Sequence, residues 1–169
     1  MAGALIVTAE LGSADLVWLD SLRRAHYPPE RNQVPAHLTL FHALPPSGEA
    51  ELRSRLRRFA VGRAPAATIA GLMDLGGGVA FRIVSPDLDR IREALAADLH
   101  GLLGAQDSGG WRPHVTIQNK VEPKVARVLK STLEREFAAR PLAIAGLGLH
   151  RYLGGPWQQL AVYRFRGIS

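Results

Sequence analysis

Residues 37–40 read HLTL and residues 114–117 read HVTI, so one pattern of histidine, apolar residue, threonine and apolar residue occurs twice. Both copies lie in stretches with strand character. Successive side chains of a strand point to opposite faces, so the histidine and the threonine of each tetrad share one face. The apolar residues can then anchor the other face in a core. The pattern predicts two imidazole–hydroxyl pairs held on rigid backbone.

The expected secondary structure repeats around the two tetrads. The order strand, helix, tetrad strand, helix is expected at residues 5–10, 13–26, 35–43 and 47–61, and again at residues 79–84, 85–103, 112–120 and 122–138. The two histidines are 77 residues apart, and the other matching landmarks are 72 to 75 residues apart. This near-constant offset indicates two copies of one structural unit. Packing them about a pseudo-two-fold axis would bring the tetrads together.

The remaining elements favour an α+β fold. The runs 141–152 and 157–166 predict a closing hairpin around residues 154–156, which read GGP. We expect a bilobal molecule in which two mostly antiparallel sheets line a central groove and helices pack outside. Each half of about 80 residues is marginal alone, so we expect one domain over 1–169, with lobes at approximately 1–75 and 76–169.

Several residues mark element ends and close approaches. Ser13 is the expected N-cap of the first helix, with Asp15 in its positive first turn. Ser85 is expected to cap the third helix, which would start with a proline. Gly146 and Gly148 lie within a strand-like run, where glycine indicates a bulge or a close approach of backbone.

The composition indicates an anionic partner. The 21 Lys and Arg residues exceed the 15 Asp and Glu residues, so the net charge is +6. Such a balance favours nucleic acid or nucleotides, although the basic run 53–58 is typical of the solvated face of an amphipathic helix. The chain has no cysteine, which excludes disulfides and thiolate metal sites.

No signal peptide is recognisable at the N-terminus, and no apolar run approaches the ~18 residues that span a bilayer. We therefore expect a cytoplasmic protein without membrane association. We also expect a monomer.

The paired tetrads and their separation resemble those of the 2H phosphoesterase superfamily, the bacterial 2′-5′ RNA ligase-like proteins in particular. Pro113 before His114 and the tail at residues 149–157 are also similar to segments of that family. The chain departs from the better-known members after each tetrad, where FHA occupies residues 41–43 and QNK occupies residues 118–120. The resemblance implies a phosphodiesterase acting on 2′,3′-cyclic phosphate ends of RNA or nucleotides, with 2′-5′ RNA ligation as the reverse reaction.

The residue types suit this chemistry without a metal or a cofactor. A histidine can act as base or acid near neutral pH, and two imidazoles can flank a phosphorus atom that undergoes in-line attack. Thr39 and Thr116 would donate hydrogen bonds to the non-bridging oxygens. The family analogy assigns His37 as the acid and His114 as the base, whereas the residues themselves leave the assignment open. No histidine spacing typical of a zinc site is present.

Five further residues are candidates for substrate contact. Phe41 and Trp111 could stack on a base, and Lys120 could contact a flanking phosphate. Arg151 and Tyr152 lie in the family-like tail and could contact phosphate and base. Phe41, Trp111 and Lys120 are of types that more often pack in the core or carry a solvated charge, so Arg151 and Tyr152 are the slightly better candidates.

Two alternatives remain at this point. The chain could be a binding module of the same fold that holds an RNA end or a nucleotide without turnover. It could also be a phosphodiesterase for another small cyclic phosphoester. Salt-dependent binding without product would indicate the first, and a panel of cyclic substrates would identify the second.

Overall fold

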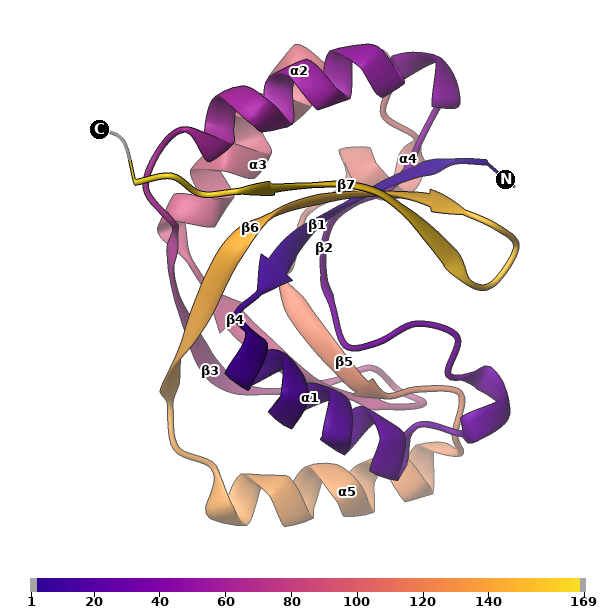
Figure 1. Cartoon of the computed structure of the whole chain (residues 1–169). Coiled ribbons are helices and arrows are strands. Elements are labelled where there is room, and N and C mark those ends of the chain that lie inside the picture. Colours follow the sequence, from indigo (N-terminus) through magenta and orange to yellow (C-terminus); the bar gives the residue numbers. More distant parts are fainter. Residues whose placement is uncertain (1–2, 168–169) are drawn as a thin grey trace.

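The computed structural model describes residues 3–167, which form seven strands, five α-helices and two short 3-10 turns (Figure 1). The strands are β1 (Leu5–Leu11), β2 (Leu38–Leu44), β3 (Ala66–Asp74), β4 (Val79–Val84), β5 (His114–Gln118), β6 (Arg140–Tyr152) and β7 (Trp157–Arg164). The helices are α1 (Ser13–His26), α2 (Glu49–Ala60), α3 (Pro86–Asp98), α4 (Ala105–Ser108) and α5 (Pro123–Glu136), and the turns are η1 (Pro29–Arg31) and η2 (Pro46–Gly48).

All seven strands belong to one antiparallel sheet with the order β2-β1-β6-β3-β4-β5, in which β7 also pairs with β6. The long strand β6 joins two parts. Its first residues pair with β3, and the rest of the strand pairs with β1 and β7. The expected α+β class is confirmed, and the two expected sheets are continuous through β6.

The helices lie outside the sheet in two groups (Figure 1). In this view α2 and α3 lie above the strands, α5 lies below them, and α1 lies in the lower half of the molecule. Although α1 follows β1 in the sequence, it packs against β5, while α5 packs against β3 and β4. Each part of the sheet combines strands from both halves of the chain, so the expected lobes at about 1–75 and 76–169 interleave.

Element boundaries follow the local signals closely at most positions. The predicted C-terminal hairpin is confirmed as β6 and β7. Ser85 is confirmed as the N-cap of α3, because its hydroxyl accepts a hydrogen bond from the Leu88 amide at 3.1 Å. The same helix was expected to reach residue 103 but ends at Asp98, since Gly101 adopts a φ of 90° that a helix cannot include.

The start of α1 differs from the prediction. The N-cap is Gly12, and Ser13 is the first helical residue without a capping hydrogen bond. The Gly12 amide donates to the Ala143 carbonyl, and the Asp15 carboxylate accepts from the Ala143 amide at 2.8 Å. A pairing with β6, 128 residues away, therefore fixes where this helix begins.

None of the helices in residues 3–167 has the length and hydrophobicity that a bilayer crossing requires.

Candidate active site

The two tetrad strands, β2 and β5, stand at opposite ends of the strand order and nevertheless lie next to each other. One turn of α1 holds both. The Asp20 carboxylate accepts a hydrogen bond from the Ala36 amide at 2.9 Å. Three residues further along α1, the Arg23 guanidinium donates to the Thr116 carbonyl at 3.1 Å. Helix α1 therefore links the two ends of the sheet beside the tetrads.

A second tie lies further along the two segments. The indole N–H of Trp111 donates to the carbonyl of Thr39 at 3.1 Å. Helix α1 links Ala36 to Thr116, and the indole links Thr39 to Trp111. The later residue of one segment thus lies beside the earlier residue of the other, so the two segments run in opposite directions. His37 and His114 both lie between these two ties, and the charge of His114 contributes to the lowered pKa of His37.

The two imidazoles are anchored in the same way. His37 Nδ1 lies 2.8 Å from the Pro35 carbonyl oxygen, and His114 Nδ1 lies 2.7 Å from the Arg112 carbonyl oxygen. A carbonyl oxygen can only accept, so Nδ1 carries the hydrogen in each ring. In the neutral form both Nε2 atoms are then unprotonated. Each ring can accept a proton at Nε2 or, once protonated, donate one there.

Each tetrad strand also has a β-bulge directly after its threonine. Thr39 pairs with Thr8 and Phe41 with Val7, so one extra residue lies between them in β2. The same shift separates Thr116 and Gln118 in β5. A bulge inverts the alternation that follows it. Phe41 and Gln118 are therefore buried, whereas the two threonines before them remain partly exposed.

His37 lies on the floor of a hollow. Part of its surface is open to solvent, but the ring is surrounded by protein, and its centroid lies 4.6 Å from that of Trp157. Burial, together with the positive charges of Arg23, His150 and His114, lowers the pKa of His37 from 6.5 to about 4, although the hydrogen bond to the Pro35 carbonyl opposes this shift. The free site therefore holds His37 neutral at pH 7, which is the form that accepts a proton.

Arg23 places a buried positive charge beside the imidazoles. Its side chain is 3% exposed, donates to Asn32 Oδ1 at 2.7 Å and stacks 4.2 Å from the Tyr27 ring centroid. Burial lowers the pKa of Arg23, yet a guanidinium remains charged at neutral pH. The sequence reasoning missed this residue. The signal was an arginine on the apolar stripe of a helix, four residues after Leu19.

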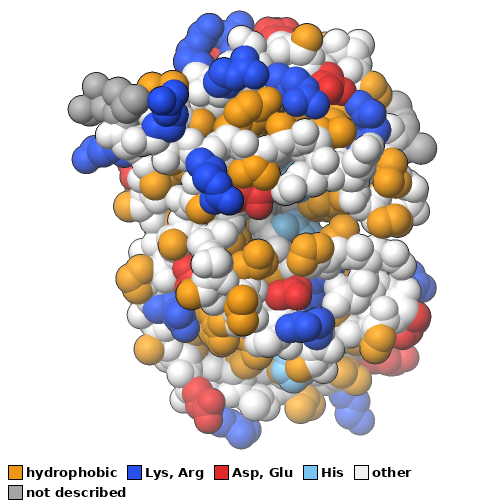
Figure 2. All heavy atoms as spheres, viewed as in Figure 1, with side chains coloured by type: hydrophobic (Ala, Val, Ile, Leu, Met, Phe, Trp, Pro, Cys, Tyr) orange, Lys and Arg blue, Asp and Glu red, His pale blue; other side chains and the backbone are white. Residues whose placement is uncertain are grey.

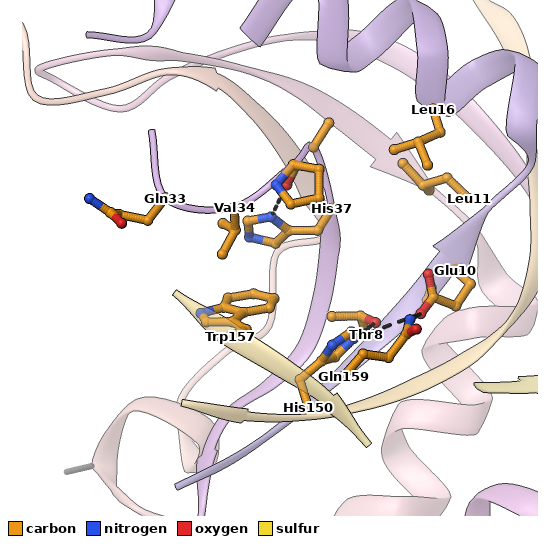
Figure 3. A pocket seen from close by; sticks show the side chains of 13 residues that line it. Thr8, Glu10, Leu11, Leu16, Gln33, Val34, His37, His150, Trp157 and Gln159 are labelled. Carbon is orange, nitrogen blue, oxygen red and sulfur yellow. Dashed lines mark hydrogen bonds and ion pairs between the residues drawn. The ribbon is translucent and has the colours of Figure 1, made fainter. Parts of the chain in front are cut away.

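A cavity of about 330 Å³ adjoins His37 (Figure 3). Trp157 covers one side of it, and Glu10 and His150 point into it. His150 Nε2 lies 2.9 Å from Thr8 Oγ1 and 3.7 Å from the Glu10 carboxylate. Burial lowers the pKa of His150 and raises that of Glu10. The sequence hinted at this cluster only through the polar residues at positions 8 and 10, which alternate along β1.

Gly148 makes room for the polar cluster. A Cβ atom at this position would lie 2.6 Å from Thr8 Oγ1 and 2.8 Å from His150 Nε2, and it would also overlap the Glu10 carboxylate. Any side chain would therefore displace all three groups. The close backbone approach expected from the sequence is found at Gly146, where a Cβ atom would lie 2.6 Å from the Tyr163 carbonyl oxygen, whereas the close neighbours of Gly148 are side chains.

A second cavity, of about 500 Å³, adjoins His114. Its lining includes Trp111 and the basic side chains of His42, Arg92 and Arg112. In the space-filling view, histidine atoms lie at the bottom of a hollow near the middle of the face (Figure 2).

The structure separates the five candidate substrate contacts. Trp111 lines the cavity beside His114, although its indole N–H is bound to backbone. Tyr152 pairs with Trp157 at the turn end of the β6–β7 hairpin, and alternation along β6 puts it on the same face as His150. These two residues remain close to the hollow.

The other three candidates lie elsewhere. Phe41 was expected beside Thr39, but the bulge turns its ring into the core, where it is fully buried and cannot reach a base. Arg151 forms an ion pair with Glu49 of α2 at 2.5 Å, on the helix-covered face of β6. Lys120 is exposed in the turn after β5, at the opposite end of that strand from His114.

Within residues 3–167 there is no group of three or more histidine, cysteine, aspartate or glutamate side chains arranged to hold a metal ion.

Comparisons with known proteins identify a family and similar folds. The family model for the 2′-5′ RNA ligase superfamily matches residues 12–156. The fold is similar to that of TT0787 from Thermus thermophilus, with 19% identity, a TM-score of 0.66 and coverage of 97% of this chain and 98% of that chain. For a crystal structure described as a phosphoesterase, the identity is 18%, the TM-score 0.57 and the coverage 96% and 98%.

The fold is also similar to that of E. coli LigT in complex with 3′-AMP, with 16% identity, a TM-score of 0.59 and coverage of 98% of this chain and 99% of that chain. LigT has further crystal structures with NADP+ and with ATP. Likeness at these identities shows the fold. No curated protein sequence matches the chain.

Proposed function

Since the chain belongs to the 2′-5′ RNA ligase superfamily, we propose that it is a metal-independent phosphodiesterase that hydrolyses 2′,3′-cyclic phosphate ends of RNA or nucleotides. The main support is the matched anchoring of two imidazoles, each with Nδ1 on the carbonyl two residues earlier and Nε2 free. Crystal structures of LigT with 3′-AMP, NADP+ and ATP support a nucleotide as the ligand class. Ligation of 2′-5′ ends would be the reverse reaction.

In the proposed reaction His37 is the base and His114 the acid. Nε2 of His37 takes a proton from water, and the water oxygen attacks phosphorus. The bond between phosphorus and one ribose oxygen breaks, and protonated His114 supplies the proton to that oxygen. The products are a phosphomonoester and a free ribose hydroxyl. The lowered pKa of His37 favours this assignment over the opposite one expected from the family analogy.

Charge and hydrogen bonding would stabilise the transition state without a metal. Negative charge accumulates on the non-bridging oxygens during in-line displacement. The partly exposed hydroxyls of Thr39 and Thr116 share the strand faces of the imidazoles and would donate to these oxygens. The buried guanidinium of Arg23, tied to the carbonyl of Thr116, adds a fixed positive charge.

The test is hydrolysis of 2′,3′-cyclic nucleotides and cyclic-phosphate RNA ends in excess EDTA. We expect turnover to persist with the chelator, and we expect His37→Ala and His114→Ala each to lower kcat by about 10²- to 10⁴-fold, the usual contribution of a general acid or base. His100→Ala is the matched control, because His100 is exposed in the turn after α3.

Full activity in either variant, or loss in EDTA that a divalent ion restores, would contradict the proposal. Tight binding of a nucleotide with no product after long incubation would instead indicate a binding module of the same fold.

A further inference from the structure

We propose that the cavity beside His37 is a nucleobase subsite, in which Trp157 stacks on the base and Glu10 accepts a hydrogen bond from an amino group of the base. This inference rests on the proposed function, because the base and the phosphate of a nucleoside 2′,3′-cyclic phosphate are carried by one ribose. A base subsite must therefore adjoin the imidazoles, as this cavity does.

The walls of the cavity suit a flat, mostly apolar ring. The volume of about 330 Å³ falls within the usual range for small-ligand sites. Apolar residues make up just over half of the lining, namely Ala9, Leu11, Leu16, Val34, Pro35, Ala36 and Trp157. The Trp157 ring borders the cavity, with centroid distances of 4.6 Å to His37 and 5.4 Å to His150 (Figure 3). A base that stacks on Trp157 would hold its ribose toward His37.

The polar end of the cavity selects a hydrogen-bond donor. Gln159 donates to the Glu10 carboxylate at 3.4 Å, and Thr8 and His150 bond to each other beside it. The Glu10 side chain is 26% exposed, so it still faces the cavity. A carboxylate only accepts hydrogen bonds, and the exocyclic amino groups of adenine, cytosine and guanine only donate them.

Charge orients the nucleotide in one direction. Buried Arg23 lies beside the imidazoles and attracts the phosphate, whereas acidic Glu10 at the other end of the cavity repels it. The cavity beside His114 carries Arg92 and Arg112 and is more polar. The base therefore belongs on the Glu10 side and the phosphate on the Arg23 side.

The kinetic test compares three cyclic phosphates that differ only in the base: the adenosine compound, its purine riboside analogue without the amino group, and a methyl riboside without a base. We expect kcat/KM to fall roughly tenfold when the amino group is removed and roughly tenfold more when the base is removed, given usual values for such a hydrogen bond and for stacking.

Two variants assign these losses. Glu10→Met keeps an unbranched chain and replaces the carboxylate by a thioether, which is only a weak acceptor, so the adenosine and purine riboside compounds should become nearly equal. Trp157→Ala should lower kcat/KM for the adenosine compound about tenfold more than for the base-free compound. Equal rates for all three substrates in the unmodified protein would overturn the subsite while leaving the proposed function intact.

A binding measurement keeps the subsite testable if no cyclic phosphate is hydrolysed, an outcome that would refute the proposed function alone. We expect 3′-AMP to quench tryptophan fluorescence and ribose 5-phosphate to leave it unchanged. The quenching should vanish in Trp157→Phe and persist in Trp18→Phe, since Trp18 lies outside the site against Phe81. Equal quenching in Trp157→Phe would overturn the inference.

Discussion

At the scale of single residues, the hydrogen bond at Nδ1 decides what each histidine can do. His37 and His114 both give this hydrogen to a carbonyl two residues earlier, so the bond is local and follows from the extended backbone before each tetrad. The alternation of side chains in a strand was enough to predict that Thr39 and Thr116 share the faces of the histidines. Trp157 belongs to the tail that resembles a family segment, but no local pattern predicted that its ring would lie against His37.

The altered pKa of His37 predicts an unusual pH profile. If His37 is the base, kcat/KM of the free enzyme stays high down to about pH 4, because the ring remains neutral above its pKa. If His37 were the acid, kcat/KM would instead decline as the pH rises above about 4. Initial rates on 2′,3′-cyclic AMP between roughly pH 3.5 and 9 distinguish the two assignments.

The same pKa has a thermodynamic counterpart that serves as a control. The unfolded chain binds a proton at His37 below pH 6.5, whereas the folded protein binds it only below about 4. The free energy of unfolding should therefore fall as the pH drops through this interval, by about 1 to 3 kcal/mol. In urea unfolding, His37→Asn should lose this part of the pH dependence. An unchanged dependence would show that His37 titrates normally.

At the scale of elements, β2 is a terminal strand of the sheet, and side chains supply some of the hydrogen bonds to its backbone that a neighbouring strand would otherwise supply. The Asp107 carboxylate of α4 accepts from the backbone amides of His42 at 2.7 Å and Ala43 at 2.9 Å. Arg92 of α3 donates to the Leu40 carbonyl at 3.1 Å. Burial alone would raise the pKa of Asp107, but the hydrogen bonds from His42 and Ala43 outweigh it and lower the pKa.

We expect Asp107→Asn to destabilise the protein. The amide has one acceptor oxygen in place of two, so the amide of His42 or Ala43 is left buried without a partner, at a cost of about 1 to 3 kcal/mol. Urea unfolding at pH 7 measures this, with Ser108→Ala as the control because the Ser108 hydroxyl bonds only within α4 and its N-cap. An unchanged midpoint would mean that Asp107 does not stabilise β2.

Some features of the elements could be predicted from neighbouring residues, and others could not. The β6–β7 hairpin and the cap at Ser85 were predictable, because their signals lie within a few residues. The start of α1 was not, since Ala143 determines it across 128 residues. The bulges after both tetrads were also missed, and they bury Phe41 and Gln118 against the simple alternation.

At the scale of the whole molecule, strand β6 and helix α1 connect the two halves of the chain. Strand β6 pairs with β1 and β3, and α1 packs against β5. The near-constant offset along the sequence predicted two equivalent units, and the two tetrads do share their anchoring and their bulges. The interleaving of the halves could not be predicted, because it depends on which distant strands pair with β6.

The net charge of +6 predicts salt-dependent binding of RNA. Basic side chains lie both above and below the central hollow (Figure 2). An RNA oligonucleotide with a cyclic-phosphate end would release counterions along its backbone, so its KM should rise several-fold between about 50 and about 200 mM salt. A cyclic mononucleotide has one phosphate, and its KM should change much less. Equal salt dependence for both would show that the surface does not attract the RNA chain.

Three side chains bind the backbone of β2, those of Asp107, Arg92 and Trp111. They also affect the association of one folded molecule with another. A terminal strand with free amides and carbonyls is a template on which another polypeptide can add a strand, which is a common start of aggregation. Here three side chains already occupy such groups. The contacts that hold β2 in place therefore also leave fewer backbone groups with which a second molecule could pair in order to polymerise.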